Sequence, residues 1–175
     1  QHELRKNDNL RKYEIKIKNY IRRFIQEKET INDISQGVFL KAFVNIQSFK
    51  PKLKFSTWIY RIAHNELVNF LKKKKSLPLF DFDVFWPGFS TEKRQIETEL
   101  EKQMLLNGFE KCFKQLAPKY REVIVLYYLE NLSYQEIAEI LKSPAATVGV
   151  RLKRAKEMVR TICQKNPAAV PAIHK

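Results

Sequence analysis

The amino-acid sequence predicts an all-α protein composed of two small helical domains joined by a flexible linker. Glycine is scarce, with 4 in 175 residues, and apolar residues recur at the helical period over long stretches. A chain of this length suits one ordinary domain or two small ones, each with a modest core. An abrupt change in composition after residue 75 favours two domains, and strands are not expected.

The charge is distributed unevenly along the chain. Residues 1–75 hold 18 Lys and Arg against 7 Asp and Glu, residues 76–110 hold 3 against 7, and residues 111–175 hold 12 against 5. Two basic blocks around an acidic one indicate two surfaces that bind a polyanion, joined by a segment that does not. Nucleic acid is the leading class of partner.

The cysteines and the hydropathy pattern predict a reduced, cytoplasmic protein with no membrane insertion. Cys112 and Cys163 have neither a C-x-x-C nor a His-containing metal spacing, and a disulfide framework would need more cysteines. The longest apolar run, Val123–Leu129, is far shorter than the roughly 20 residues of a membrane span. No signal peptide opens the chain, although a first residue of Gln1 rather than Met leaves the natural start open.

The first domain is expected over residues 10–75. Apolar residues at helical spacing predict one helix within residues 13–25 and a second within residues 31–49, and these two helices should pack together. The inner face of the second is read as Ile34, Val38, Phe39, Ala42, Phe43 and Ile46. Pro51 breaks the pattern, and Ser56 is expected to cap a third helix over about residues 57–75.

Residues 76–98 are interpreted as the linker, because "SLPLFDFDVFWPGFS" combines prolines, a glycine and aromatics without a helical period. Two explanations of its aromatics stay open. They could pack on a neighbouring domain, or they could dock on a partner protein or occupy a channel.

The second domain is expected over residues 99–162, with a disordered tail over 163–175. Pro118 starts a helix that is apolar on most faces. Ser133 and Glu136 form a capping box for the next helix, and Ser143 and Pro144 supply the N-cap and first position of the last one. Two short helices joined by a tight turn, the second basic, predict a helix-turn-helix.

Three segments together carry a resemblance: "DISQGVFLKAF", "FSTWIYRIAHN" and "LSYQEIAEILKSPAATVGVRLKRAK". In this order and separation they resemble the two conserved regions of a bacterial RNA polymerase sigma factor of the small extracytoplasmic-function (ECF) group. The resemblance covers residues 13–75 and 103–160. It implies that core RNA polymerase, through its β′ clamp and β subunit, and promoter DNA are partners, and that an anti-sigma protein is expected.

The resemblance also implies sites in the first domain. The polymerase-binding residues would be Asp33, Gln36, Phe39 and Lys41, and those that bind the opened minus-ten element would be Tyr60, Arg61, Asn65, Asn69, Lys72 and Lys73. Unpaired bases need amide groups for their edges, and the displaced backbone needs cations. Asn65 and Asn69 share a helix face, whereas Tyr60 could equally be a core residue and Trp58 is read as core.

In the second domain the resemblance implies that the minus-thirty-five element is bound by Pro144, Thr147, Gly149, Arg151, Lys153 and Arg154. The chain also departs from the family pattern. Gly37 stands where glutamate is common, Gly149 and Val150 where a basic and a small polar residue are usual, and Lys142 where the turn has glycine. Backbone binding is therefore better supported than base reading.

Three functions are compatible with a helical, basic chain of this kind. A sigma factor accounts for every segment, whereas a stand-alone helix-turn-helix regulator leaves "FSTWIYRIAHN" and the helix before it without a role. A nucleic-acid enzyme would need clustered metal ligands, a phosphate loop or a nucleophile with its base. The sequence offers none of these, so no catalytic residue, metal site or cofactor is predicted.

Overall fold

The computed structural model describes residues 2–49, 54–73 and 109–165. Every element in these ranges is helical, which confirms the predicted all-α class. The chain divides into two compact units, residues 1–78 with 135–143 and residues 79–134 with 144–175. Among the described helices, none is both long and apolar enough to cross a membrane.

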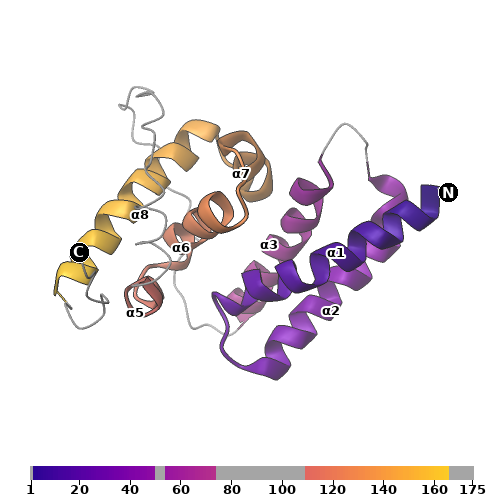
Figure 1. The fold of residues 1–175 in the computed structure, drawn as a ribbon, viewed down its shortest axis with the longest axis horizontal. Coiled ribbons are helices and arrows are strands. Elements are labelled where there is room, and N and C mark those ends of the chain that lie inside the picture. The colour runs from indigo at the N-terminus through magenta and orange to yellow at the C-terminus, as the bar shows by residue number, and fades with distance from the viewer. Residues whose placement is uncertain (1, 50–53, 74–108, 166–175) are drawn as a thin grey trace, which may run out of the picture. The chain divides into compact units, whose positions relative to one another are not determined.

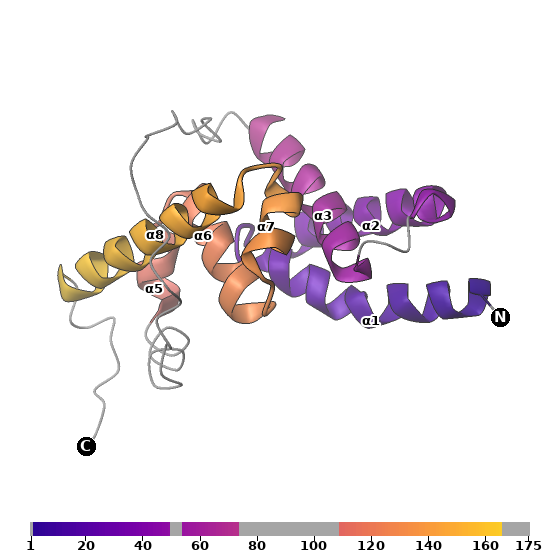
Figure 2. The same cartoon turned by 90° about the horizontal axis from the view of Figure 1, so that it is seen from above.

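Helices α1 (His2–Arg22), α2 (Lys28–Asn45) and α3 (Phe55–Lys73) pack against one another as a bundle in the first unit (Figures 1 and 2). A short 3₁₀ turn, η1 (Ile46–Ser48), follows α2. Each helix turns an apolar stripe inward, as its sequence period predicts. The core contains Ile17, Tyr20, Ile21, Ile34, Val38, Ala42, Ile59, Ala63, Leu67 and Leu71.

Three expectations about this unit need correction. Helix α1 begins at His2, well before the predicted start near residue 13. Helix α3 begins at Phe55, so Ser56 lies in its first turn and is not its cap. Phe43, expected on the inner face of α2, is 63% exposed, because the inner face is already filled at the neighbouring positions Val38, Ala42 and Ile46.

The second unit contains α5 (Phe109–Lys114), α6 (Pro118–Ile124), the π-helical turn η2 (Val125–Leu129) and α8 (Ala145–Lys165). Pro118 opens α6, as predicted. Helix α8 packs on α5 and α6 through a stripe of small and branched side chains, namely Val148, Leu152, Ala155 and Val159. Arg121 of α6 donates hydrogen bonds to the carbonyls of Lys114 and Leu116, and burial lowers the pKa of its guanidinium.

Helix α7 (Tyr134–Leu141) ends in a turn that leads to α8. Lys142 adopts a left-handed conformation with φ 50°, and the amide of Ser143 donates to the carbonyl of Ala138 at 3.0 Å. This is the Schellman arrangement, in which glycine is preferred at the left-handed position. The left-handed backbone at this position explains why glycine is usual where this chain has Lys142.

The predicted cap of α8 is wrong in detail. Helix α8 starts at Ala145, and the carbonyl of Pro144 accepts the first helical hydrogen bond, from Val148 at 3.2 Å. Pro144 is therefore the N-cap and not the first helical residue. The hydroxyl of Ser143 is buried without a hydrogen-bond partner among the described residues, whereas its backbone amide closes α7.

The two cysteines, for which the sequence predicts no disulfide framework, come together in the structure. Cys112 of α5 and Cys163 of α8 form a disulfide, with their Cα atoms 5.7 Å apart. They are 51 residues apart in the sequence, so the pair cannot be recognised from a short cysteine spacing. The packing of α5 against the end of α8 brings them together.

The linker proposed for residues 76–98, including its aromatics, lies outside the described residues, as do residues 99–108 and 166–175. The proposed tail begins too early, because residues 163–165 belong to α8.

Candidate polymerase and nucleic-acid interfaces

Helix α2 presents an exposed stripe that combines polar and apolar side chains. Its members share one helix face, since they are spaced by three and four residues. Leu40, Phe43 and Val44 are 66%, 63% and 69% exposed. Gln36 and Asp33 are exposed on the same face, one turn and two turns before Leu40. We call Asp33, Gln36, Leu40, Phe43 and Val44 the docking stripe.

The other two predicted polymerase-binding residues lie off this stripe. Phe39 is half-buried. Lys41 turns toward α3, where its ammonium pairs with the carboxylate of Glu66. Sequence reasoning missed Leu40, Phe43 and Val44. The available signal was that α2 carries more apolar residues than one inward face can accommodate.

Helix α3 places four of its predicted DNA-binding residues along one outer face. Spacings of four, four and three residues place them one above another on successive turns. They are Arg61, Asn65, Asn69 and Lys72. Asn65, Asn69 and Lys72 are exposed and Arg61 is half-exposed. We call these four residues the amide face. Lys73 is exposed beside it.

Tyr60 is a core residue, contrary to its predicted contact with DNA. Its side chain is 1% exposed, and its ring packs edge-on against Tyr20 at 5.6 Å and near Tyr13 at 6.2 Å. Trp58 is also buried, at 5%, as expected. Half-exposed aromatics at this end of α3 include Phe49 and Phe55, whose rings lie 5.6 Å apart.

Helix α8 distributes its predicted DNA-binding residues over two flanks. Thr147, Arg151 and Arg154 follow one flank at spacings of four and three, whereas Gly149 and Lys153 lie on the other. Lys153, Arg154 and the preceding Pro144 are exposed, and Thr147, Gly149 and Arg151 are half-buried. The helix period thus separates residues that the sequence placed in one group.

Gly149 lies against an aromatic ring. A Cβ atom at this position would meet Cε2 of Tyr134 at 3.4 Å, an ordinary van der Waals distance. Tyr134, at the start of α7, is 37% exposed and its ring lies 5.3 Å from that of Tyr127. A longer side chain at position 149 would therefore run along Tyr134 before reaching solvent.

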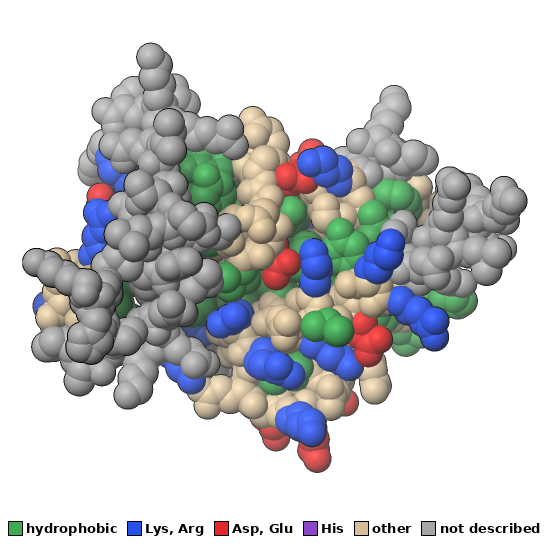
Figure 3. Space-filling model, viewed as in Figure 1, with side chains coloured by type: hydrophobic (Ala, Val, Ile, Leu, Met, Phe, Trp, Pro, Cys, Tyr) green, Lys and Arg blue, Asp and Glu red, His purple; other side chains and the backbone are tan. Residues whose placement is uncertain are grey.

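Charge alone does not locate these sites. Figure 3 shows Lys and Arg side chains spread over the visible surface, with Asp and Glu among them and apolar side chains between. The helical registers of α2, α3 and α8 are more informative, because they say which side chains a single partner can touch at once.

Two families match the chain: Sigma-70 region 2 over residues 10–77, and Sigma-70, region 4 over residues 106–159. The ECF RNA polymerase sigma factor SigW of Bacillus subtilis is 37% identical over 155 residues, covering 85% of this chain and 83% of the relative. The chain belongs to the ECF RNA polymerase sigma factors. The ECF RNA polymerase sigma-E factor of Haemophilus influenzae is 32% identical over 161 residues, covering 87% and 84%.

Solved structures share the fold of this sigma factor. RpoE of Bartonella quintana, in complex with the anti-sigma factor NepR, matches with a TM-score of 0.68 and 19% identity over 91% of this chain and 97% of that one. CnrH, in complex with the cytosolic domain of CnrY, matches with a TM-score of 0.65 and 20% identity over 92% and 88%. Like its family, the chain directs transcription initiation, and the comparisons give no support to a stand-alone helix-turn-helix regulator.

Proposed function

We propose that this sigma factor binds core RNA polymerase through the docking stripe of α2, and that α3 and α8 divide the promoter between them. The docking stripe would lie on the β′ clamp. The amide face of α3 would hold the opened minus-ten element, and α8 would hold the duplex of the minus-thirty-five element. The second unit would also approach the β subunit. The chain would act as a non-catalytic subunit in the cytoplasm.

The exposed apolar part of the docking stripe is the observation that carries this proposal. Three large apolar side chains, each more than 60% exposed, are adjacent on one helix, and contiguous apolar surface of this kind typically marks a binding site for another protein. The polar members of the stripe, Asp33 and Gln36, can add specificity at its edge.

The amide face suits single strands better than duplex. Asn side chains can donate to and accept from the edges of unpaired bases, and the neighbouring cations Arg61 and Lys72 can meet phosphates. Helix α8 offers cations on two flanks, which suits the two backbones that border a groove. Gly149 is half-buried against Tyr134. This supports a smaller contribution of base contacts than of backbone contacts to DNA binding on that flank.

An anti-sigma partner is proposed as well. The solved relative RpoE is in complex with the anti-sigma factor NepR. The shared fold supports, for this chain, an inhibitor that competes with core polymerase.

The test is binding to purified core polymerase. Replacing Leu40 and Phe43 together by serine should weaken binding about tenfold or more, because truncated anchors of an interface commonly cost above 1 kcal/mol each. Ile15→Ser is the matched control, since Ile15 is 71% exposed on α1 and lies outside the stripe. Equal affinity of the double variant and the control, with helix content unchanged, would refute the docking stripe.

A further inference from the structure

The contact that joins α2 to α3 lies at the border of the docking stripe. The ammonium of Lys41 pairs with Oε1 of Glu66, 25 residues further along the chain. The Glu66 side chain is 18% exposed and that of Lys41 is 55% exposed. Lys41 lies one residue after Leu40 of the stripe, and Glu66 lies one residue after Asn65 of the amide face. One ion pair therefore borders both surfaces.

Gly37 makes room for this pair. A Cβ atom at position 37 would lie 3.3 Å from Oε2 of Glu66, closer than most such contacts in proteins. One oxygen of the Glu66 carboxylate, Oε2, therefore lies over the α2 backbone at Gly37. The other oxygen, Oε1, pairs with Lys41, one helical turn further along α2. The Glu66 side chain is largely shielded from solvent, whereas that of Lys41 is exposed, so solvent and salt screen the pair in part.

We propose that the Lys41–Glu66 pair, seated over Gly37, is a positioning contact that fixes the register of the amide face of α3 against the docking stripe of α2. It rests on the proposed function of those two surfaces. Polymerase bound to α2 would hold the opened strand at a set place, and Asn65 and Asn69 must reach it there. A small slide or rotation of α3 on α2 would move both amides together. Glu66 would act through α3 and would touch neither DNA nor polymerase.

The experiment measures promoter opening by holoenzyme at saturating core polymerase. Glu66→Gln keeps the shape of the side chain and removes its charge, and we expect opening to slow about three- to tenfold, in the lower part of the range of coupling between contacting residues. Gly37→Ala, which pushes on the same carboxylate, should slow opening in the same direction. Helix content and affinity of Glu66→Gln for core polymerase should stay within twofold of the parent.

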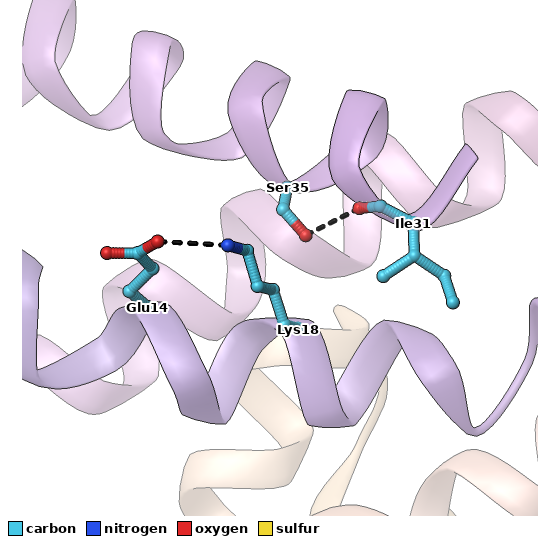
Figure 4. Close-up of polar contacts among 4 residues, drawn as sticks. All are labelled: Glu14, Lys18, Ile31 and Ser35. Carbon is cyan, nitrogen blue, oxygen red and sulfur yellow. Dashed lines mark hydrogen bonds and ion pairs between the residues drawn. The ribbon is translucent and has the colours of Figure 1, made fainter. Parts of the chain in front are cut away.

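A charge exchange separates positioning from general damage. The double variant Lys41→Glu with Glu66→Lys should open promoters at least threefold faster than Glu66→Gln. Glu14→Gln is the control, because Glu14 and Lys18 form an exposed ion pair within α1 at 2.9 Å, which joins no two helices (Figure 4). It should leave opening unchanged.

Asn65→Ala, measured in parallel, distinguishes failure of the positioning contact from failure of the proposed function of the amide face. If Asn65→Ala slows opening while Glu66→Gln and Gly37→Ala do not, the positioning contact is refuted and the proposed function stands. If neither Asn65→Ala nor the Glu66 variants have any effect, both are refuted. Loss of opening in Glu66→Gln without improvement by the charge exchange also overturns the pair, because a specific ion pair should tolerate reversal.

Discussion

Helices α3 and α8 both carry cations that the sequence predicts to meet DNA, yet they present them differently. Helix α3 aligns Arg61, Asn65, Asn69 and Lys72 on a single face, whereas α8 separates Arg151 and Arg154 from Lys153 on two flanks. One face suits one displaced strand, and two flanks suit the two backbones of a duplex. The difference fits the proposal that α3 contacts an opened strand and α8 contacts duplex.

The two helices are also held in different ways. Helix α3 is held in its unit by an apolar core and the ion pair at Glu66, whereas α8 is additionally bonded to α5 through Cys163 and Cys112. In a reducing cytoplasm such a bond would be open to reduction.

Reduction of the disulfide should destabilise the second unit and leave α1–α3 unchanged. Closing a loop of 51 residues stabilises by about 4 kcal/mol in the chain-entropy description. Hydrogen exchange with and without a phosphine reductant should show faster exchange in α5 and α8 on reduction. Cys112→Ser, which cannot form the bond, should not respond to the reductant. Identical protection of α8 in both conditions would contradict the role of the bond.

Removing a cation from α8 should weaken binding to all duplexes alike. Arg151→Gln, Lys153→Gln and Arg154→Gln should each lower the slope of log affinity against log salt by about 1, as expected for one lost phosphate contact. The measurement is a salt titration on promoter and unrelated duplexes, with Lys12→Gln, an exposed cation of α1, as control. A loss confined to the promoter sequence would instead assign that residue to base reading.

Gly149→Ala should stabilise the second unit. Alanine gains about 1 kcal/mol over glycine within a helix, and the added Cβ meets Tyr134 at an ordinary distance of 3.4 Å. Thermal unfolding followed by circular dichroism should show the gain, while duplex affinity remains unchanged. Stabilisation accompanied by loss of duplex binding would indicate that the backbone at Gly149 approaches DNA closely.

Lys142→Gly should give a smaller gain, about 0.5 kcal/mol, because glycine adopts the left-handed conformation without the Cβ penalty but loses more chain entropy on folding. Asn131→Gly is the matched comparison, since Asn131 is also left-handed at φ 53° and asparagine tolerates this conformation better. We therefore expect Asn131→Gly to gain less in the same unfolding experiment.

The fold could be predicted because periodic apolar residues determine which face of each helix is buried. The alignment of Asn65 with Asn69 followed from spacing alone. The sequence could not predict burial where several apolar residues compete for one core. Phe43 and Ala42 are both apolar, so residue type did not show which of them points inward. Tyr60 could not be excluded from the surface, since tyrosine is both apolar and polar. These choices depend on packing between helices.

Contacts between segments that are distant in the sequence could not be predicted either. The pairing of Cys112 with Cys163 and that of Lys41 with Glu66 depend on helix packing, which sequence spacing does not encode. At Gly37 the sequence indicated only a departure from the family pattern. The structure adds that the carboxylate of Glu66 lies over that glycine.

If the amide face of α3 acts on opened strands while α8 holds duplex, loss of both asparagines should impair promoter opening and spare the closed complex. Holoenzyme carrying Asn65→Ala with Asn69→Ala is compared with the parent for closed-complex affinity and for the permanganate reactivity of thymines near the minus-ten element. With two hydrogen bonds lost at about 1 kcal/mol each, opening should fall about tenfold or more and closed-complex affinity should stay within twofold. Equal losses in both measurements, or no loss in either, would contradict the account.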